Sequence, residues 1–255
     1  NIQMQAQNKK YKGMVSSDWS ECLAPCSPFD CISFNYPQLT DELETVFKQY
    51  TGNVISLGEA AHKIQTLLPA TLTVEQMDAY LDNSFVTYKG VPELIEWCLS
   101  KDIPFMINTT GMIGYFQRVF AKNLLPRIPV LSAHPMVRYA QQQSDPDVIF
   151  DLFEIKDKGT NTEAAVRHFN IPFNKIILMG DSGGDGSHFE WGAKAGAFLI
   201  GSMTKSSLAK YCLNKNITIN VRFGISDTAG EKRELKNELQ IDFMDLAPII
   251  EDSIM

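Results

Sequence analysis

The sequence contains no long apolar run. A helix that spans a bilayer needs about 20 consecutive, mostly apolar residues, whereas this chain of 255 residues, 44% of them hydrophobic, distributes its apolar residues over short segments. Its opening stretch, NIQMQAQNKKYKG, is polar and lacks the apolar core of a signal peptide. We therefore expect no membrane partner and a cytoplasmic location.

Basic clusters are also missing. The formal net charge is −7, and the 23 lysine and arginine residues are scattered along the chain. Because nucleic-acid binding requires a concentrated positive surface, we expect no nucleic-acid partner. The lysine-containing glycine loop of P-loop proteins is absent, and no Gly-x-Gly-x-x-Gly follows the first predicted strand. An acidic chain that binds an anion must supply positive charge locally, through lysine, a metal ion or helix N-termini.

Cysteine is sparse, with five residues in the chain. Cys22, Cys26 and Cys31 lie close together in the sequence, but they form no Cys-x-x-Cys pair and no histidine is near them. A structural zinc site usually takes four ligands at tighter spacing. We interpret these cysteines as small buried thiols near a loop, and the sequence assigns them no other role.

A segment without predicted strands follows the first strand. In residues 39–50, apolar side chains recur at helical spacing on one face. Capping boxes that begin at Ser56 and Thr73 predict the starts of two more helices, and Pro92 suits the first turn of a fourth. We interpret residues 37–100 as a helical cap domain inserted into a larger domain.

Strands and helices alternate in the rest of the chain. Short apolar runs predict strands over 14–17, 103–108, 128–134, 175–180, 197–201 and 217–223. Such alternation is typical of an α/β protein with a mainly parallel, Rossmann-like sheet covered on both faces. Residues 136–157, with the polar tip QQQSDPD, predict a β-hairpin instead. The core domain would then comprise residues 1–36 and 101–255.

Carboxylates follow two of the predicted strands. Asp18 comes directly after the first strand, and Asp181 and Asp185 lie in the glycine-rich turn GDSGGD after the strand at 175–180. Ligands of such sheets bind outside the carboxyl ends of the strands, so we expect these carboxylates to meet. Oxygen ligands of this kind suit Mg²⁺. The sequence therefore predicts a magnesium site.

Groups suited to an anion lie at the same predicted edge. Thr109, Thr110 and Gly111 follow the second strand just before a helix, and Lys158 precedes another helix in KDKGT. A lysine and the amides of helix N-termini can hold phosphate oxygens. With cations nearby, Asp18 would stay ionised and could attack phosphorus to form an aspartyl phosphate.

Four motifs, in order, resemble those of the haloacid dehalogenase-like (HAD) superfamily over about residues 11–202: SSDWSECL, INTTGM, DKG and MGDSGGD. The helical insert after the first motif is similar to the small cap of the phosphoserine phosphatase-like branch, which includes methylthiopentenyl-phosphate phosphatases. The resemblance implies that Asp18 is the nucleophile and that Thr109 and Lys158 bind phosphate. The implied Mg²⁺ ligands are the main-chain carbonyl of Ser20 and the side chains of Asp18, Asp181 and Asp185.

Ser20 departs from the family pattern. Phosphatases of this superfamily normally carry aspartate two residues after the nucleophile, where it protonates the leaving oxygen and later activates water. General acid–base catalysis of this kind contributes about 10²–10⁴-fold. One interpretation is that another group replaces the acid, and the candidates are Glu21, His134, His188 and a group on the substrate.

Two further interpretations stay open. Phosphonoacetaldehyde hydrolases of the superfamily also lack the second aspartate and use a cap lysine as a Schiff base, for which Lys48 and Lys63 are candidates. Alternatively, the fold is kept as a binding or regulatory module with little turnover. We predict a Mg²⁺-dependent phosphatase for a small phosphorylated metabolite, with Asp18, Ser20 and Lys158 in the catalytic positions. The sequence leaves the substrate and the oligomeric state open.

Overall fold

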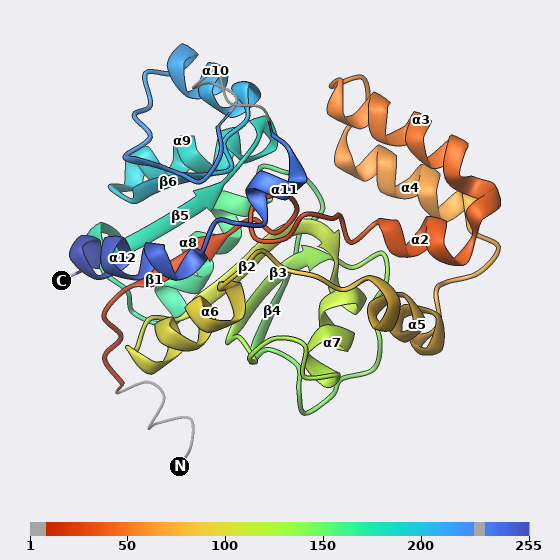
Figure 1. The fold of residues 1–255 in the computed structure, drawn as a ribbon, viewed down its shortest axis with the longest axis horizontal. Coiled ribbons are helices and arrows are strands. Elements are labelled where there is room, and N and C mark those ends of the chain that lie inside the picture. The colour runs from red at the N-terminus through yellow and green to blue at the C-terminus, as the bar shows by residue number, and fades with distance from the viewer. Residues whose placement is uncertain (1–8, 227–232, 255) are drawn as a thin grey trace.

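The fold is a seven-stranded sheet between layers of helices, seen in a computed structural model that describes residues 9–226 and 233–254 (Figure 1). All neighbouring strands are parallel, in the order β4-β3-β2-β1-β5-β6-β7. The strands are β1 (Met14–Ser17), β2 (Phe105–Met112), β3 (Val130–His134), β4 (Val148–Asp151), β5 (Ile176–Gly180), β6 (Phe198–Ser202) and β7 (Val221–Phe223). The predicted α/β class with a Rossmann-like parallel sheet is confirmed.

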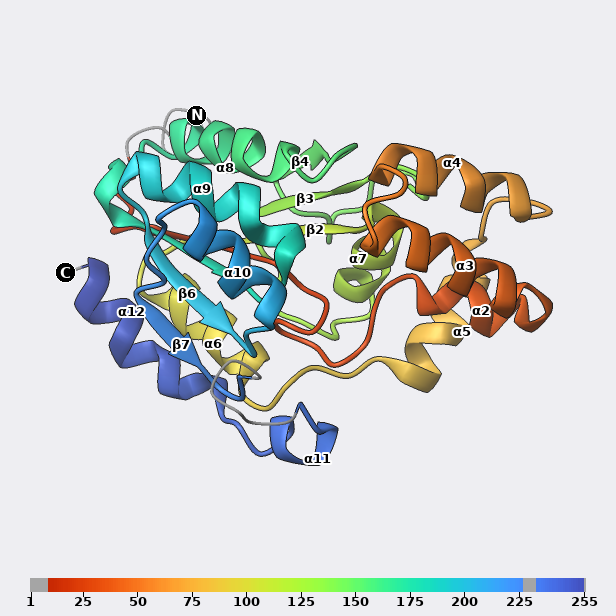
Figure 2. The ribbon, with the colours of Figure 1, turned by 90° about the horizontal axis from the view of Figure 1, so that it is seen from above.

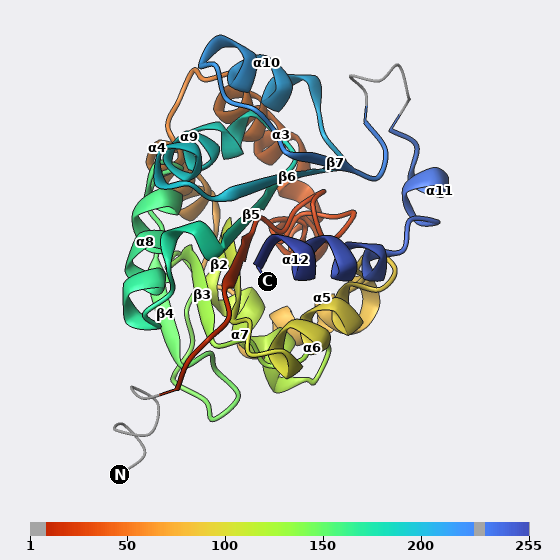
Figure 3. The ribbon, with the colours of Figure 1, turned by 90° about the vertical axis from the view of Figure 1, so that its left-hand side faces the viewer.

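Helices cover both faces of this sheet (Figure 3). One face carries α8 (Asp157–His168), α9 (Gly186–Ala195) and α10 (Ser206–Asn214), and the other carries α6 (Val91–Ser100), α7 (Ile113–Ala121) and α12 (Leu246–Ile254). Successive strand residues point to opposite faces, so Met14 packs with the first group and Val15 with the second. Burial on both faces explains why the strands read as continuous apolar runs. Across the described helices, none combines the length and apolarity that a membrane crossing requires.

The remaining larger helices lie beyond the carboxyl ends of the strands (Figure 2). They are α2 (Asp30–Asn35), α3 (Thr40–Thr51), α4 (Leu57–Leu67) and α5 (Val74–Ser84), with the short η1 (Pro37–Leu39) between α2 and α3. The predicted capping boxes at Ser56 and Thr73 are both present at the starts of α4 and α5. Their apolar faces join the buried cluster on the α6 and α7 side of the sheet, so helices and sheet share one core.

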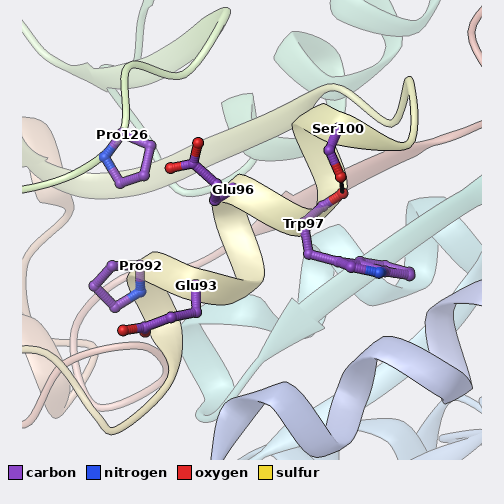
Figure 4. A pocket seen from close by; sticks show the side chains of 6 residues that line it. All are labelled: Pro92, Glu93, Glu96, Trp97, Ser100 and Pro126. Atoms are coloured by element: carbon purple, nitrogen blue, oxygen red, sulfur yellow. Dashed lines mark hydrogen bonds between the residues drawn. The ribbon is translucent and has the colours of Figure 1, made fainter.

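Helix α6 belongs to the packing of the sheet. It contacts β2 and α12, and Pro92 lies in its first turn. The division into a core of residues 1–36 and 101–255 and a cap of residues 37–100 stays a prediction. It would assign α6 to the cap, although α6 packs against β2 of the sheet. The outer side of α6 carries a hollow of about 390 Å³, in which Glu96 points toward Pro126 (Figure 4).

The predicted β-hairpin over residues 136–157 is wrong. Strand β4 pairs with β3 in parallel at the edge of the sheet, and the polar stretch before it is a crossing loop. The loop is tied to the core through Asp145, whose Oδ2 accepts from Gln117 Nε2 (3.1 Å) and whose carbonyl accepts from Arg127 Nε (2.8 Å). A polar stretch between two apolar runs fits an antiparallel hairpin and a connection between parallel strands equally well. The pairing of β4 with β3 shows that it is the second.

The C-terminal segment returns to the linker that follows α5. It contains α11 (Leu235–Glu238) and η5 (Phe243–Asp245) before α12. Phe243 stacks on Tyr88 of the linker with ring centroids 5.5 Å apart, and its N–H donates to the Lys89 carbonyl at 2.8 Å. The two segments, far apart in the sequence, therefore pack as one unit.

Candidate active site

Four charged side chains meet at the carboxyl ends of β1 and β5. Asp18 follows β1, Asp181 and Asp185 lie in the turn after β5, and Lys158 lies in the first turn of α8. Lys158 Nζ donates to Asp18 Oδ1 at 3.1 Å and to Asp185 Oδ1 at 2.7 Å. Carboxylate oxygens of the three aspartates lie within 4.8 Å of one another. Residues from three separate motifs thus form one buried ionic cluster.

The turn after β5 folds around one carboxylate. Asp185 Oδ2 accepts from the backbone N–H of Asp181 at 2.9 Å and of Ser182 at 3.3 Å. A Cβ at Gly180 would lie 2.7 Å from Cβ and Cγ of Asp185, so this close approach requires glycine. On the neighbouring strand, the Asp18 N–H donates to the Met179 carbonyl at 3.0 Å. Sheet pairing therefore continues up to the charged cluster.

Burial and mutual repulsion set the charge of the cluster. Burial raises the pKa of Asp18, and the Asp185 charge raises it further; burial, Asp18 and Asp185 raise the pKa of Asp181 well above its usual range. At Asp185 burial acts in the same direction, but the Lys158 ammonium outweighs it and lowers the pKa. Burial would lower the pKa of Lys158, yet the Asp18 and Asp185 carboxylates raise it. Asp18 and Asp185 thus share one buried cation, whereas the charge that lowers the pKa of Asp181 is that of Lys205.

The donor set fits a hard divalent cation. Asp181 Oδ1 is buried and has no hydrogen-bond partner among the described residues. A buried acceptor without a partner is costly unless a ligand satisfies it. Oxygen donors with an excess of negative charge are what Mg²⁺ binds, and Asp18, Asp181 and Asp185 supply them. The residues present therefore fit this metal.

The turn after Asp18 is rigid. The Trp19 carbonyl accepts from the N–H of Leu23 at 2.9 Å, and the N–H of Glu21 donates to the Ala24 carbonyl at 2.7 Å. Glu21 has a positive φ of 58°, a conformation that is uncommon outside glycine. The Trp19 ring is buried and packs edge-on against Phe116, with centroids 5.4 Å apart. Ser20, which lies between these anchors, is half-buried.

Thr109, Thr110 and Gly111 lie within the last part of β2, which runs further than the predicted strand. Because β2 pairs with β1, they share the edge that carries Asp18. Thr109 is buried, and its Oγ1 accepts from the Gly111 N–H at 3.0 Å. A Cβ at Gly111 would lie 2.8 Å from Pro28 Cγ, so a larger residue does not fit here. Phosphate binding by these three residues stays a prediction.

Two of the candidate replacement acids are held by other contacts. His188 is 1% exposed, and its Nε2 lies 2.8 Å from Thr162 Oγ1 on the α8 side of the sheet. Burial and the Lys158 charge lower the pKa of His188 to about 3, so its ring is neutral. His134 Nδ1 accepts from the Met136 N–H at 2.9 Å, and β2 separates its strand from β1.

Glu21 belongs to a second charged group that motif reasoning does not find. Its carboxylate is paired with Lys205, whose Nζ lies 4.0 Å from Asp181 Oδ2. Arg233 Nη1 lies 3.8 Å from the same oxygen. Both cations come from segments outside the four motifs, and no spacing in the sequence links them to Asp181.

The two cap lysines considered for Schiff-base chemistry are exposed. Lys63 Nζ donates to Gln49 Oε1 at 3.1 Å. A lysine that forms a Schiff base is normally activated by an apolar pocket or a neighbouring cation. The surroundings of Lys48 and Lys63 therefore give no support to this chemistry.

The cysteine cluster next to the first motif consists of free thiols. Cys22 and Cys31 are buried and Cys26 is half-buried. Cys22 Sγ lies 3.7 Å from Ser17 Oγ, and burial raises the pKa of Cys22. A protonated, buried thiol packs as a small apolar side chain.

Comparison with known proteins places the fold. No sequence model of a protein family matches the chain, and no curated protein matches it. Among solved structures, phosphoserine phosphatase in a phospho-aspartyl intermediate analogue superposes with a TM-score of 0.65 at 16% identity, covering 94% of this chain and 99% of that one. A HAD family hydrolase from Salmonella enterica serovar Typhi gives 0.64 at 14% identity, covering 95% and 72%. Cytosolic 5'-nucleotidase IIIB bound to cytidine also superposes, with a TM-score of 0.58 at 15% identity, covering 94% of this chain and 84% of that one.

The fold is therefore that of the HAD hydrolases, as the four motifs predict. Within that class, the arrangement is like that of phosphoserine phosphatase.

Proposed function

We propose that this protein is a Mg²⁺-dependent phosphatase that acts on a small phosphorylated metabolite through an aspartyl phosphate at Asp18. The observation that carries the proposal is the buried cluster of Asp18, Lys158, Asp181 and Asp185 at the carboxyl edge of the sheet. The HAD fold, shared with phosphoserine phosphatase, supports the same reaction class.

The residues of the cluster have distinct tasks in this proposal. Lys158 orients Asp18 through its bond to Oδ1 and favours the ionised carboxylate, which burial and the Asp185 charge oppose. Asp18 then attacks phosphorus, the bond from phosphorus to the leaving oxygen breaks, and an aspartyl phosphate forms. Water next attacks that phosphorus as its bond to the Asp18 oxygen breaks; Asp18 returns to a carboxylate, and the water's oxygen leaves with the inorganic phosphate, which also takes up the proton. Asp18, Asp181, Asp185 and the Ser20 carbonyl would hold Mg²⁺, which when bound would neutralise the charge of the anionic substrate.

Phosphate oxygens need donors beside the nucleophile. Lys158 lies next to Asp18, and the Thr109 hydroxyl and the Thr110 amide lie on the adjacent strand, where the Gly111 N–H is bonded to Thr109 Oγ1. Donors that are fixed before the reaction stabilise the charge of the transition state without reorganisation. We assign the phosphate site to these four residues.

The leaving group must compensate for Ser20. His188 is buried and hydrogen-bonded to Thr162, and the strand of His134 is separated from β1 by β2. The Glu21 carboxylate is paired with Lys205. We therefore infer that the leaving oxygen departs without a protein acid. Acyl phosphates and phosphates of acidic phenols or enols have such leaving groups, because the departing oxygen is a weak base that is stable as an anion.

A phosphate-release assay across a graded series of substrates tests this function. With Mg²⁺ present, kcat/KM is measured for acyl phosphates, nitrophenyl phosphate, phenyl phosphate and alkyl phosphates. We expect kcat/KM to fall steeply as the leaving group becomes more basic. Ser20→Asp should raise kcat/KM for alkyl phosphates by about 10²-fold, the lower end of what a general acid contributes. Ser20→Asn, which has similar size but no acid, should not.

Controls separate this function from its alternative. Asp18→Asn should abolish turnover of every substrate, since the nucleophile is lost. Turnover that survives Asp18→Asn contradicts the proposal. If the wild type turns over none of the substrates but binds Mg²⁺ with phosphate, the second candidate function, a binding or regulatory module, is correct; the half-buried Ser20 in the acid position is what favours it.

A further inference from the structure

The C-terminal segment reaches the candidate active site through one side chain. Arg233 precedes α11, and its guanidinium is only 13% exposed. Nη1 donates to the Met203 carbonyl at 2.9 Å, and Nη2 donates to the Glu21 carbonyl at 3.2 Å and to the Tyr88 hydroxyl at 3.3 Å. Nε is paired with Glu238. One side chain therefore joins the turn after Asp18, the loop after β6 and the linker after α5.

The same guanidinium faces one oxygen of Asp181. Arg233 Nη1 lies 3.8 Å from Asp181 Oδ2, and Lys205 Nζ lies 4.0 Å from it. The other oxygen, Oδ1, is buried and has no partner among the described residues. Two cations beside one oxygen restrict the rotation of the carboxylate, and one oxygen of each of Asp18, Asp181 and Asp185 lies within 4.8 Å of the other two.

The contacts of Glu21 with Arg233 and Lys205 also fix the turn that carries the Ser20 carbonyl, the second proposed metal ligand. Glu21 follows Ser20 and holds its left-handed φ of 58° while its carbonyl accepts from Arg233. Its carboxylate is paired with Lys205, whose N–H donates to the Asp181 carbonyl at 2.8 Å. The turn that presents the Ser20 carbonyl and the turn that presents Asp181 are thus held by the same two cations.

We propose that Arg233 is a positioning residue, which orients the Asp181 carboxylate and the Ser20 turn so that their oxygens are preset for a divalent cation. The inference rests on the proposed function, because it concerns the metal of that site. A flat guanidinium with several donors can serve the carbonyls of Met203 and Glu21 and still face Asp181, whereas the ammonium of lysine cannot span them. Partners behind the direct ligands of a metal typically change its affinity by about 10–100-fold when removed.

Positioning and simple charge repulsion predict opposite results. A cation near a metal site repels the metal, so loss of its charge alone would tighten Mg²⁺ binding. Loss of orientation weakens Mg²⁺ binding instead. The sign of the change in affinity therefore identifies the role of Arg233 without any measurement of activity.

The experiment is a calorimetric titration of the full chain with MgCl₂. We expect Arg233→Met to raise the Kd for Mg²⁺ at least 10-fold, and Arg233→Lys to give a smaller increase. Lys89→Met is the matched control, because Lys89 pairs with Asp242 of the same C-terminal segment at 4.0 Å, away from the site. Lys89→Met should leave Kd unchanged. Circular dichroism verifies that each variant is folded, and Arg233→Lys decides the question if Arg233→Met does not fold.

Several outcomes overturn the inference. Tighter binding by Arg233→Met assigns Arg233 to charge repulsion, and a Kd within twofold of the wild type leaves it no role at the metal. An equal loss in Lys89→Met attributes the effect to the C-terminal segment as a whole. A wild type that binds no Mg²⁺ overturns the proposed metal site itself, so this result is distinct from a failure of Arg233 alone.

Discussion

The substitution Lys158→Met tests the ionic cluster most directly. It removes the ammonium that is bonded to Asp18 at 3.1 Å and to Asp185 at 2.7 Å, while it keeps the length of the apolar stem. At an effective dielectric constant of about 20, each attraction amounts to about 5–6 kcal/mol before the cost of desolvation is subtracted. Removal of one partner of a buried ion pair costs about 3–5 kcal/mol in practice. We expect the free energy of unfolding to fall by that amount.

Urea unfolding at two pH values measures the effect. Without Lys158 the carboxylates of Asp18 and Asp185 lose the cation that lowers their pKa values, so the folded variant takes up protons that the unfolded chain does not bind. Raised pKa values in the folded state favour folding at low pH and disfavour it as pH rises. The deficit relative to the wild type should therefore be larger at pH 8 than at pH 5.5.

A neighbouring lysine provides the control. Lys156 directly precedes α8 and is exposed, so Lys156→Met should change the free energy of unfolding by no more than about 0.5 kcal/mol. A loss below 1 kcal/mol in Lys158→Met, or a deficit that does not depend on pH, would refute the buried cluster described here.

Three further changes have defined outcomes. Because burial lowers the pKa of His188 to about 3, the unfolded chain binds one more proton than the folded protein between that pH and its ordinary pKa near 6.5. When the pH is lowered from 7 to 5, the free energy of unfolding of the wild type should therefore fall by about 2 kcal/mol more than that of His188→Gln, as measured by urea unfolding. Equal decreases in the two proteins would contradict this. Gly180→Ala places a Cβ 2.7 Å from the Asp185 side chain, so it should lower the free energy of unfolding by about 1–3 kcal/mol. The same variant should bind Mg²⁺ more weakly in calorimetry, and an unchanged Kd would contradict the close contact between Gly180 and Asp185. The Gly58 N–H at the start of α4 donates to Glu154 Oε1 at 3.0 Å, and Glu154→Gln replaces this charged acceptor with a neutral one. Hydrogen exchange of the Gly58 amide should therefore accelerate severalfold. Equal exchange rates would show that this bond does not hold α4 to the loop before α8.

Local signals in the sequence were sufficient where the controlling interactions are local. The capping boxes at Ser56 and Thr73 depend on residues three positions apart, and both are present. The hairpin over residues 136–157 failed because a polar loop carries no local sign of its direction. That direction is visible only in the tertiary structure, where β4 pairs with β3 in parallel and Asp145 ties the loop to Gln117 on another element.

The acids that were to replace the missing aspartate show the same limit. His188 follows the turn after β5 in the sequence, which made it a candidate, yet the helix turns its ring toward Thr162. Whether a side chain is free depends on what covers it, and for His188 the cover comes from α8 and α9. Composition and spacing do not contain that information.

By itself the sequence determined the α/β class and the approach of the three aspartates. This was possible because parallel strands place their carboxyl ends at one edge. Lys158 was also singled out, but it follows the segment expected to form a hairpin, and only the parallel pairing of β4 with β3 places it at that edge. Only the tertiary structure decided which oxygen of Asp181 stays free, since Arg233 arrives there from a segment with no periodic pattern. Contacts of 3–4 Å depend on the path of the whole chain, and that path is set by packing that no single motif encodes.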